Sequence, residues 1–157
     1  MSVRYWYWVP AVTGLIADLV SKQVVFNALA RGGRLALLGP WLVLRLQKNR
    51  GGVFGIFQGK GFIFVILTAV ALGFVAWMVC KAGAGQRRLH FALGLVTAGA
   101  LGNLCDRLFL GYVRDFIYIE AINYPAFNLA DACICVAAVL LFIEILRDSR
   151  QEQGNKA

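Results

Sequence analysis

Residues 61–80, GFIFVILTAVALGFVAWMVC, decide the fold class of this chain. The segment contains no charged residue and is apolar along almost its whole length. A helix of about 20 mostly apolar residues crosses the hydrocarbon core of a bilayer, which is roughly 30 Å thick. Residues 61–80 are therefore predicted to form a transmembrane helix.

Three more apolar stretches flank this segment, roughly over residues 6–26, 89–105 and 129–146. Of the 157 residues, 60% are hydrophobic and only 15% are charged, whereas a soluble domain averages about half and about a quarter. So short a chain cannot bury that much apolar surface in one water-soluble core. We expect a single integral-membrane domain over residues 1–157, an all-α bundle of four transmembrane helices.

The first apolar stretch has two interpretations. Arg4 precedes it, and Asn27–Ala30 ends in the small-x-small pattern of a signal-peptide cleavage site. However, Asp18 and Lys22 interrupt the run, which is unusual in the hydrophobic region of a signal peptide. We favour a retained helix, on which Asp18 and Lys22 lie four residues apart in the order that favours an ion pair. Such a pair serves either helix packing or chemistry, and spacing alone does not decide between them.

The segment between the first two spans has a different composition. Short apolar runs are separated by Gly39 and Pro40 and by a Gly-rich turn at residues 49–52. Such runs predict small strands rather than a further helix. We expect a small β-rich element, roughly residues 35–58, lying on the membrane surface. At the other end of the chain, the polar tail 150–157 is expected to be disordered.

The formal net charge of +8 favours lipid over nucleic acid as a partner. Basic residues that flank membrane spans usually lie at the headgroup level and attract anionic lipid. The sequence has no stripe of aromatic and basic residues of the kind that single-stranded nucleic acid requires. Lys81, Arg87 and Arg88 favour a cytoplasmic loop between the second and third spans. The first loop is also basic, so counting charges hardly decides the topology.

Polar residues gather where the third span ends and the fourth begins. Ionisable residues in spans are costly, so they usually face the bundle interior and have a role. Asn103 and Asp106 share one helical face, and Asn128 and Asp131 repeat the Asn-x-x-Asp pattern. Asp115 lies in the short loop between the two spans. Three aspartates are therefore expected at one membrane face.

Small residues on the third span predict how it packs. Gly94, Ala98 and Gly102 recur every four residues, upstream of the polar cluster. A stripe of this kind lets a neighbouring helix approach closely. We therefore expect the stripe to be a helix-packing face.

The sequence offers few alternatives to carboxylate chemistry. His90, the only histidine, lies far from the aspartates along the third span and is expected to be interfacial. The four cysteines form no CxxC pair and are expected to be small core residues, and neither a phosphate loop nor HExxH is present. Two adjacent carboxylates share a proton, so one can activate water while the other polarises a carbonyl, as in aspartyl proteolysis. Physics alone does not choose the pair among Asp18, Asp106, Asp115 and Asp131.

Five blocks of the chain resemble the signal peptidase II family, the prolipoprotein signal peptidases of bacteria. They extend over nearly the whole chain and are Asp18–Lys22, Asn49–Phe54, Ala98–Arg107, Gly111–Ile117 and Pro125–Asp131. Each block is weak alone, but their order on a four-span chain is specific. The resemblance implies an intramembrane aspartyl endopeptidase that cleaves diacylglyceryl-modified prolipoproteins just before the lipidated cysteine, without a metal or organic cofactor. It also implies cytoplasmic termini, a β-rich periplasmic cradle and an active site near the outer face of the bacterial inner membrane.

Residue roles carry over by motif position. The resemblance implies that Asp115 and Asp131 form the catalytic dyad. Around them, the residues expected to position the dyad and the substrate are Asn103, Asp106, Arg107 and Asn128. The remaining matches are Asn49 and Gly51 in the cradle segment and the Asp18 and Lys22 pair on the first helix. The expected partners are prolipoprotein substrates and membrane lipids, with no nucleic acid, and the chain is expected to act as a monomer.

The chain departs from the family pattern at three positions. Arg114 stands where an apolar residue is usual, and Gly55 and Ala132 stand where serines are common. An inward-pointing cation at position 114 could lower the pKa of Asp115. We expect Arg114 to face the aqueous loop instead.

Two other functions compete with the peptidase. One is a small transporter or proton-relay subunit, and the other is a catalytically inactive relative that binds lipoproteins. A relay would spread its acids through the depth of the bilayer, whereas Asp106, Asp115 and Asp131 gather at one face. The presence of both dyad aspartates argues against the inactive relative.

Overall fold

The computed structural model describes residues 3–51, 60–83 and 85–154. Within these ranges the chain forms four long helices, which are α1 (Val3–Ala28), α2 (Gly61–Lys81), α3 (Arg87–Leu110) and α4 (Leu129–Gly154). Each is long and apolar enough to cross a membrane. The prediction of four transmembrane helices is confirmed.

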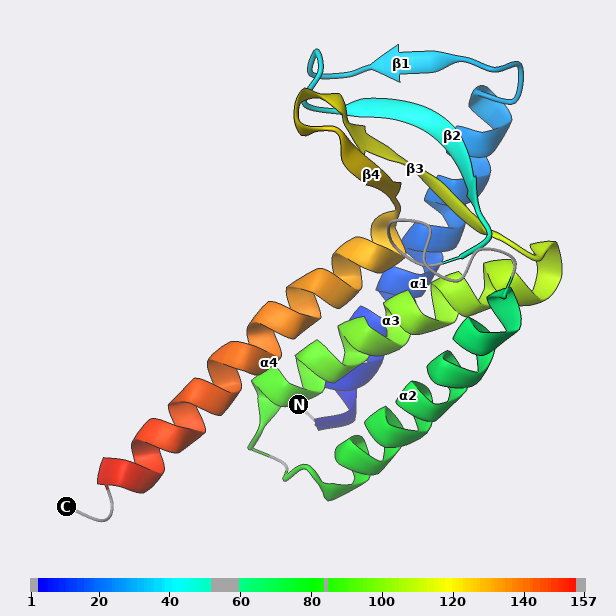
Figure 1. The fold of residues 1–157 in the computed structure, drawn as a ribbon. Coiled ribbons are helices and arrows are strands. Elements are labelled where there is room, and N and C mark those ends of the chain that lie inside the picture. The colour runs from blue at the N-terminus through cyan, green and yellow to red at the C-terminus, as the bar shows by residue number, and fades with distance from the viewer. Residues whose placement is uncertain (1–2, 52–59, 84, 155–157) are drawn as a thin grey trace.

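Helix α3 is the centre of the bundle. The other three helices each pack against it (Figure 1). Half of the most apolar stretch of α3 is buried, against 6% of the corresponding stretch of α2. The outward faces of α2 and α4 carry exposed apolar side chains such as Val70 and Phe142. These faces suit contact with lipid tails, which are as apolar as the side chains themselves.

The small residues of α3 let α1 approach closely, as their spacing predicted. A Cβ atom added at Gly94 would collide with the carbonyl oxygen of Tyr7, and one added at Gly102 would collide with the carboxylate of Asp18. Between them, Ala98 is fully buried. The stripe is therefore a helix-packing face.

The first loop and the connection from α3 to α4 form one antiparallel sheet. In the part of the chain that the structure describes, the strands in spatial order are β1 (Arg34–Ala36), β2 (Val43–Asn49), β3 (Val113–Ile119) and β4 (Tyr124–Phe127). The β-rich element predicted for the first loop is present as β1 and β2. The remainder of the predicted range 35–58 includes residues 52–58, among them Gly55, which lie outside the described residues.

The expectation of a short loop between the third and fourth spans is wrong. This connection holds β3, the 3-10 turn η2 (Glu120–Ile122) and β4. The sequence of β3, VRDFIYI, is rich in the β-branched and aromatic residues that suit a pleated strand. It pairs with β2, where Asn49 lies opposite Val113. Pro125 lies within β4, at the edge of the sheet, where a missing backbone donor is tolerated.

Helix α4 is longer than the sequence predicted. It continues past Leu146 to Gly154, although the tail 150–157 was expected to be disordered. The residues after Leu146 include Arg, Gln and Glu, which are good helix formers. Extending an existing helix also avoids the cost of a new nucleus. Residues 155–157 lie outside the described residues.

The sheet lies at one end of the bundle, and both termini and the α2–α3 connection lie at the other (Figure 1). Helix α3 ends at Leu110 and is capped by Gly111, whose φ of 75° is the left-handed conformation that glycine adopts without strain. The chain then enters β3, and β4 leads directly into α4. The polar end of α3 and the polar start of α4 therefore meet beneath the sheet.

Candidate active site

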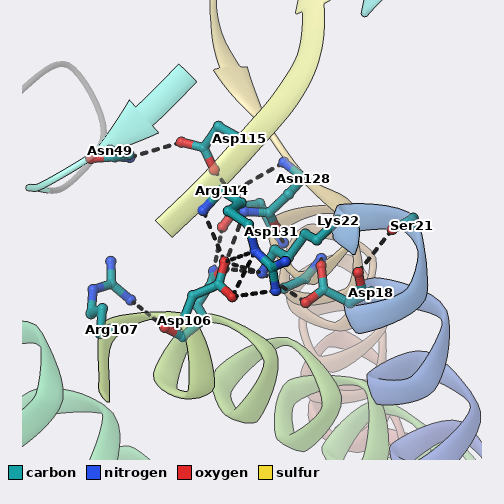
Figure 2. A network of polar contacts seen from close by, with 12 residues as sticks. Asp18, Ser21, Lys22, Asn49, Asp106, Arg107, Arg114, Asp115, Asn128 and Asp131 are labelled. Carbon is teal, nitrogen blue, oxygen red and sulfur yellow. Dashed lines mark hydrogen bonds and ion pairs between the residues drawn. The ribbon is translucent and has the colours of Figure 1, made fainter. Parts of the chain in front are cut away.

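Two asparagines join Asp115 of β3 to Asp131 in the first turn of α4 (Figure 2). Asn128 Nδ2 donates a hydrogen bond to Asp115 Oδ1 at 2.7 Å, and Asn103 Nδ2 donates to Asp131 Oδ1 at 2.8 Å. Asn128 Nδ2 also donates to Asn103 Oδ1 at 3.1 Å. The two carboxylates are thus connected by a continuous bridge of amides.

The start of α4 fixes the orientation of Asp131. Asn128 directly precedes the helix, and its Oδ1 accepts a hydrogen bond from the Asp131 N–H at 3.0 Å. In return, Asp131 Oδ2 accepts a hydrogen bond from the Asn128 N–H at 3.2 Å. This reciprocal arrangement is a capping box. Oδ2 of Asp131 therefore caps the start of α4, and Oδ1 accepts the hydrogen bond from the amide bridge.

Asp115 is almost fully buried, with 1% of its surface exposed. Burial penalises the charged carboxylate and raises the pKa of Asp115 to about 7. The hydrogen bonds that Asp115 accepts from Asn49 Nδ2 at 2.9 Å and from Asn128 oppose this rise, whereas the nearby charge of Asp131 adds to it. Near neutral pH, Asp115 therefore readily holds a proton.

Ion pairs on α1 and α3 lie next to the carboxylates of Asp115 and Asp131. The predicted pair of Asp18 and Lys22 is confirmed, with 2.7 Å between Nζ and Oδ2 and both side chains fully buried. Lys22 Nζ also lies 3.4 Å from Asp106 Oδ2 and donates to Asn103 Oδ1 at 3.1 Å. Asp18 Oδ1 accepts a hydrogen bond from the Ala130 N–H at 2.9 Å. The pair thereby ties α1 to both α3 and α4.

Arg114 does not face the aqueous loop, and the expectation that it would is wrong. Its Nη2 donates to Asp106 Oδ1 at 2.8 Å, and its backbone N–H donates to Asp106 Oδ2 at 2.9 Å. Another guanidinium nitrogen, Nη1, donates to Gln23 Oε1 at 3.1 Å. The guanidinium turns inward because a buried carboxylate is costly unless it is paired and hydrogen-bonded.

Arg107 and Gly51 meet beside Asn49, which donates to Asp115. Arg107 Nη2 donates to the carbonyl oxygen of Gly51, and Nη1 donates to that of Asn103, both at 3.5 Å. The Gly51 N–H donates to Asn49 Oδ1 at 3.0 Å, which leaves Asn49 Nδ2 directed at Asp115. Every residue that the motifs predicted for the site therefore contacts another member of the set.

Other reactive side chains lie outside this network. His90, which was expected to be interfacial, lies in the first turn of α3, where it is buried with Nδ1 2.8 Å from the Gln86 carbonyl oxygen. Cys80 and Cys135 are exposed rather than in the core, because a thiol is apolar enough to face lipid. Among the residues that the structure describes, no three His, Cys, Asp or Glu side chains gather as possible metal ligands.

Sequence reasoning missed the contact of Arg114 with buried Asp106 and its contact with exposed Gln23. Gln23 directly follows Lys22, but consecutive helical residues do not share a face, so its position gave no signal. Arg114 is brought to Asp106 by the turn at Gly111 and by the entry into β3. Only a prediction of that strand could have indicated the contact.

The chain is similar to known proteins of one family. The family model described as signal peptidase (SPase) II matches residues 11–147. A lipoprotein signal peptidase from Halalkalibacterium halodurans is 34% identical over 152 residues, which is 96% of this chain and 97% of the relative.

Two solved structures, each described as a bacterial membrane enzyme, are also similar to this chain. One has a TM-score of 0.84 and 30% identity, over 90% of this chain and 87% of the solved chain. The other has a TM-score of 0.80 and 31% identity, over 89% of this chain and 92% of the solved chain. On the family match, the near full-length relative and the shared fold, the chain belongs to the signal peptidase II family, whose members remove the signal peptides of prolipoproteins.

Proposed function

We propose that Asp115 and Asp131 are the catalytic dyad with which this enzyme cleaves diacylglyceryl-modified prolipoproteins just before the lipidated cysteine. The amide bridge through Asn103 and Asn128 carries the proposal, because it links the two carboxylates in one enclosed polar site. Carboxylates held in such a site favour a single shared proton. That protonation state supplies both a base and an acid for peptide hydrolysis.

Asp115 is the proposed holder of the shared proton, because burial raises its pKa to about 7. Asp131 takes a proton from a water molecule as the water oxygen attacks the scissile carbonyl carbon. Asp115 gives its proton to the carbonyl oxygen, which forms a neutral gem-diol. When the C–N bond breaks, Asp131 passes its proton to the leaving nitrogen, and Asp115 recovers a proton from a diol hydroxyl. Both carboxyl groups then return to their starting states.

The surrounding polar residues are proposed to position the dyad and the substrate. Asn49 and Asn128 donate to the two oxygens of Asp115, so they orient its carboxyl group. The hydrogen bonds of Arg107 to backbone carbonyls are long, at 3.5 Å, and its guanidinium also lies over the Phe64 ring. Such long hydrogen bonds leave the guanidinium nitrogens suited to bind a substrate carbonyl. The proposed supporting set is Asp18, Lys22, Asn49, Gly51, Asn103, Asp106, Arg107 and Asn128.

We place the proposed site near the periplasmic face of the bacterial inner membrane, with both termini in the cytoplasm. The exposed apolar faces of the helices supply surfaces for membrane lipids and for the acyl chains of the substrate. The proposed working unit is a monomer, because one chain is sufficient to supply both dyad carboxylates and the asparagines that bind them.

The proposal is tested by cleavage of a diacylglyceryl-modified prolipoprotein by the purified enzyme in detergent. The variants are Asp115→Asn and Asp131→Asn, each of which keeps the shape of the side chain and removes its ionisable group. Asparagine at position 131 also keeps an oxygen that can accept the N–H of Asn128, so the start of α4 is preserved. Glu144→Gln, an equivalent change on α4 away from the network, is the matched control.

We expect the wild type and Glu144→Gln to cleave before the lipidated cysteine, and both aspartate variants to be folded but inactive. A wild type that binds but does not cleave a competent substrate would exclude the peptidase activity. If only one of the two variants is inactive, the dyad assignment is wrong. Asp106 is then the alternative partner, because it lies in the same network.

A further inference from the structure

A buried row of alternating charges runs from α1 to the first residues of β3 (Figure 2). Its members in order are Asp18, Lys22, Asp106 and Arg114, and successive charged groups lie 2.7, 3.4 and 2.8 Å apart. The first three side chains expose 1% or less of their surface, and Arg114 exposes 12%. Two carboxylates and two cations give the row no net charge.

Arg114 makes this neutrality possible. Its Nε lies 3.1 and 3.3 Å from the two oxygens of Asp106, and its Nη2 lies 2.8 Å from Oδ1. Lys22 is therefore not required to neutralise Asp106 alone, and its shorter contacts are with Asp18 and Asn103. Without Arg114, one cation would face two buried carboxylates, and the row would carry a net negative charge.

The backbone of Arg114 connects the row to Asp115. The Arg114 N–H donates to Asp106 Oδ2 at 2.9 Å, and Asp115 is the next residue along β3. Nη1 of Arg114 donates to Gln23 Oε1 of α1. Gln23 Nε2 donates in turn to Asn27 Oδ1 at 3.0 Å. The start of the strand is thus held from two helices.

Lys22 connects the row to Asp131. Its Nζ donates to Asn103 Oδ1, and Asn103 Nδ2 donates in turn to Asp131 Oδ1. A change in the charge balance at Asp106 would change its attraction for Lys22, which lies between Asp106 and Asp18. That change therefore reaches both members of the dyad, one through the strand and one through Asn103.

We propose that Arg114 is a positioning residue for the dyad, which it serves by neutralising Asp106 and by fixing the start of β3. The inference rests on the assignment of Asp115 and Asp131 as the catalytic pair. Among the described residues, Lys22 and Arg114 are the cations that form ion pairs with Asp106. Arg107 of α3 hydrogen-bonds to backbone carbonyls, and Lys48, opposite Arg114 in the sheet, has its Nζ over the Tyr112 ring.

The test compares Arg114→Gln, which removes the charge, with Arg114→Lys, which keeps it, in the prolipoprotein cleavage assay. The readouts are kcat, KM and the pH dependence of kcat. For Arg114→Gln we expect kcat to fall roughly 10- to 100-fold with KM little changed, because the dyad is misplaced rather than the substrate site. Both limbs of the pH profile should move to higher pH, since added negative charge makes the dyad hold its proton more tightly.

Arg114→Lys should lower kcat but keep both limbs at the wild-type pH. The matched control is Arg45→Gln, which removes an exposed cation of β2 that lies over the Tyr118 ring, and it should change neither readout. If Arg114→Gln does not fold, the double variant Asp106→Asn with Arg114→Gln, which again leaves the row neutral, takes its place. If both limbs of the pH profile of kcat in the double variant stay at the wild-type pH, the proposal is supported. If the limbs are shifted, the proposal is overturned.

The role of Arg114 is excluded if Arg114→Gln matches the wild type. It is also excluded if the glutamine and lysine variants lose activity equally with unshifted limbs, because that result indicates packing alone. Asp115→Asn and Asp131→Asn in the same assay separate this failure from that of the dyad. If either cleaves, the dyad assignment fails, whereas two inactive variants beside a normal Arg114→Gln overturn only the inference.

Discussion

Asp115 and Glu120 lie five residues apart in the same sheet region but hold their protons differently. Desolvation raises the pKa of buried Asp115 to about 7. The Arg34 guanidinium, which donates to both oxygens of Glu120 at 2.9 and 2.5 Å, instead lowers the pKa of Glu120. The folded protein therefore gains stability from a protonated Asp115 and from an ionised Glu120.

We predict that Asp115→Asn becomes more stable relative to the wild type as the pH rises. The unfolded chain releases the proton of Asp115 near the ordinary pKa of 3.8, whereas the folded chain keeps it up to about 7. Between these values folding takes up a proton, so the stability of the wild type falls as the pH rises. A pKa difference of this size corresponds to at most about 4 kcal/mol. Thermal unfolding in detergent should show a gap in Tm that widens from about pH 4 to about pH 8.

Glu120→Gln is the control, because its effect on stability should change with pH in the opposite direction. Because its folded pKa is lowered, Glu120 stabilises the protein above its ordinary pKa, and this contribution disappears as the pH falls. The variant should therefore lose a little stability at neutral pH and none in acid. A Tm gap for Asp115→Asn that stays constant with pH would contradict a buried, protonated Asp115.

At the level of single residues, the sequence predicted partners that lie close along one helix and missed those brought together by strands. Asp18 and Lys22 are neighbours by helical periodicity alone, so their ion pair could be predicted. The contact of Arg114 with Asp106 depends on the turn at Gly111 and on β3. The choice of Asp115 and Asp131 among the acids needed the family resemblance, because spacing left the pair open.

Among the elements, the close contact of α1 with α3 is the one most sensitive to added volume. We predict that Gly102→Ala destabilises the protein by roughly 1–3 kcal/mol, because the new methyl group forces an overpacked contact. That methyl group would collide with the carboxylate of Asp18 and lie 3.3 Å from the Cβ of Ala130. Cleavage should also slow, since displacing Asp18 disturbs Lys22 and its bond to Asn103. Thermal unfolding and kcat measure the two effects.

Gly73→Ala is the matched control for this change. Gly73 lies within α2, and a Cβ atom there would meet nothing within 4 Å. Alanine at this site should be neutral or stabilise the helix by up to about 1 kcal/mol. An equal effect of the two substitutions would mean that the contact between Gly102 and α1 is looser than the structure indicates.

The helices could be predicted from the sequence because their signal is continuous and local. About 20 apolar residues identify a span whatever it packs against. Strands β3 and β4 could not be predicted in this way, because they are short and because β3, the pairing partner of β4, joins the sheet through β2, far away in the sequence. Their alternation is also irregular, since β3 buries Asp115 and Phe116 in succession. The register shifts in the β2–β3 and β3–β4 pairings also break the regular alternation that identifies a strand in a sequence.

For the whole molecule, the fold explains why counting charges left the topology open. The sheet carries several basic residues, but many of them have partners within it. Arg34 pairs with Glu120, while Arg45 and Lys48 lie over the rings of Tyr118 and Tyr112. The positive-inside rule applies to short loops near the ends of transmembrane helices, and it predicts little about the side on which a folded element lies. The end with the termini has a short connection, flanked by Lys81, Arg87 and Arg88, to which the rule does apply.

We therefore predict that the α2–α3 connection faces the cytoplasm and the sheet faces the periplasm. The test places single cysteines in a variant whose four native cysteines are replaced by serine. Arg31→Cys introduces an exposed cysteine between α1 and β1, and Gly85→Cys introduces one between α2 and α3, where a side chain meets nothing within 4 Å. In spheroplasts, a membrane-impermeant maleimide should label the first directly and the second only after lysis. Cleavage activity of both variants shows that the fold is intact, and the reverse labelling pattern in active protein would place the proposed dyad at the cytoplasmic face. The substrate would then have to approach it from that side, which the proposed function does not allow.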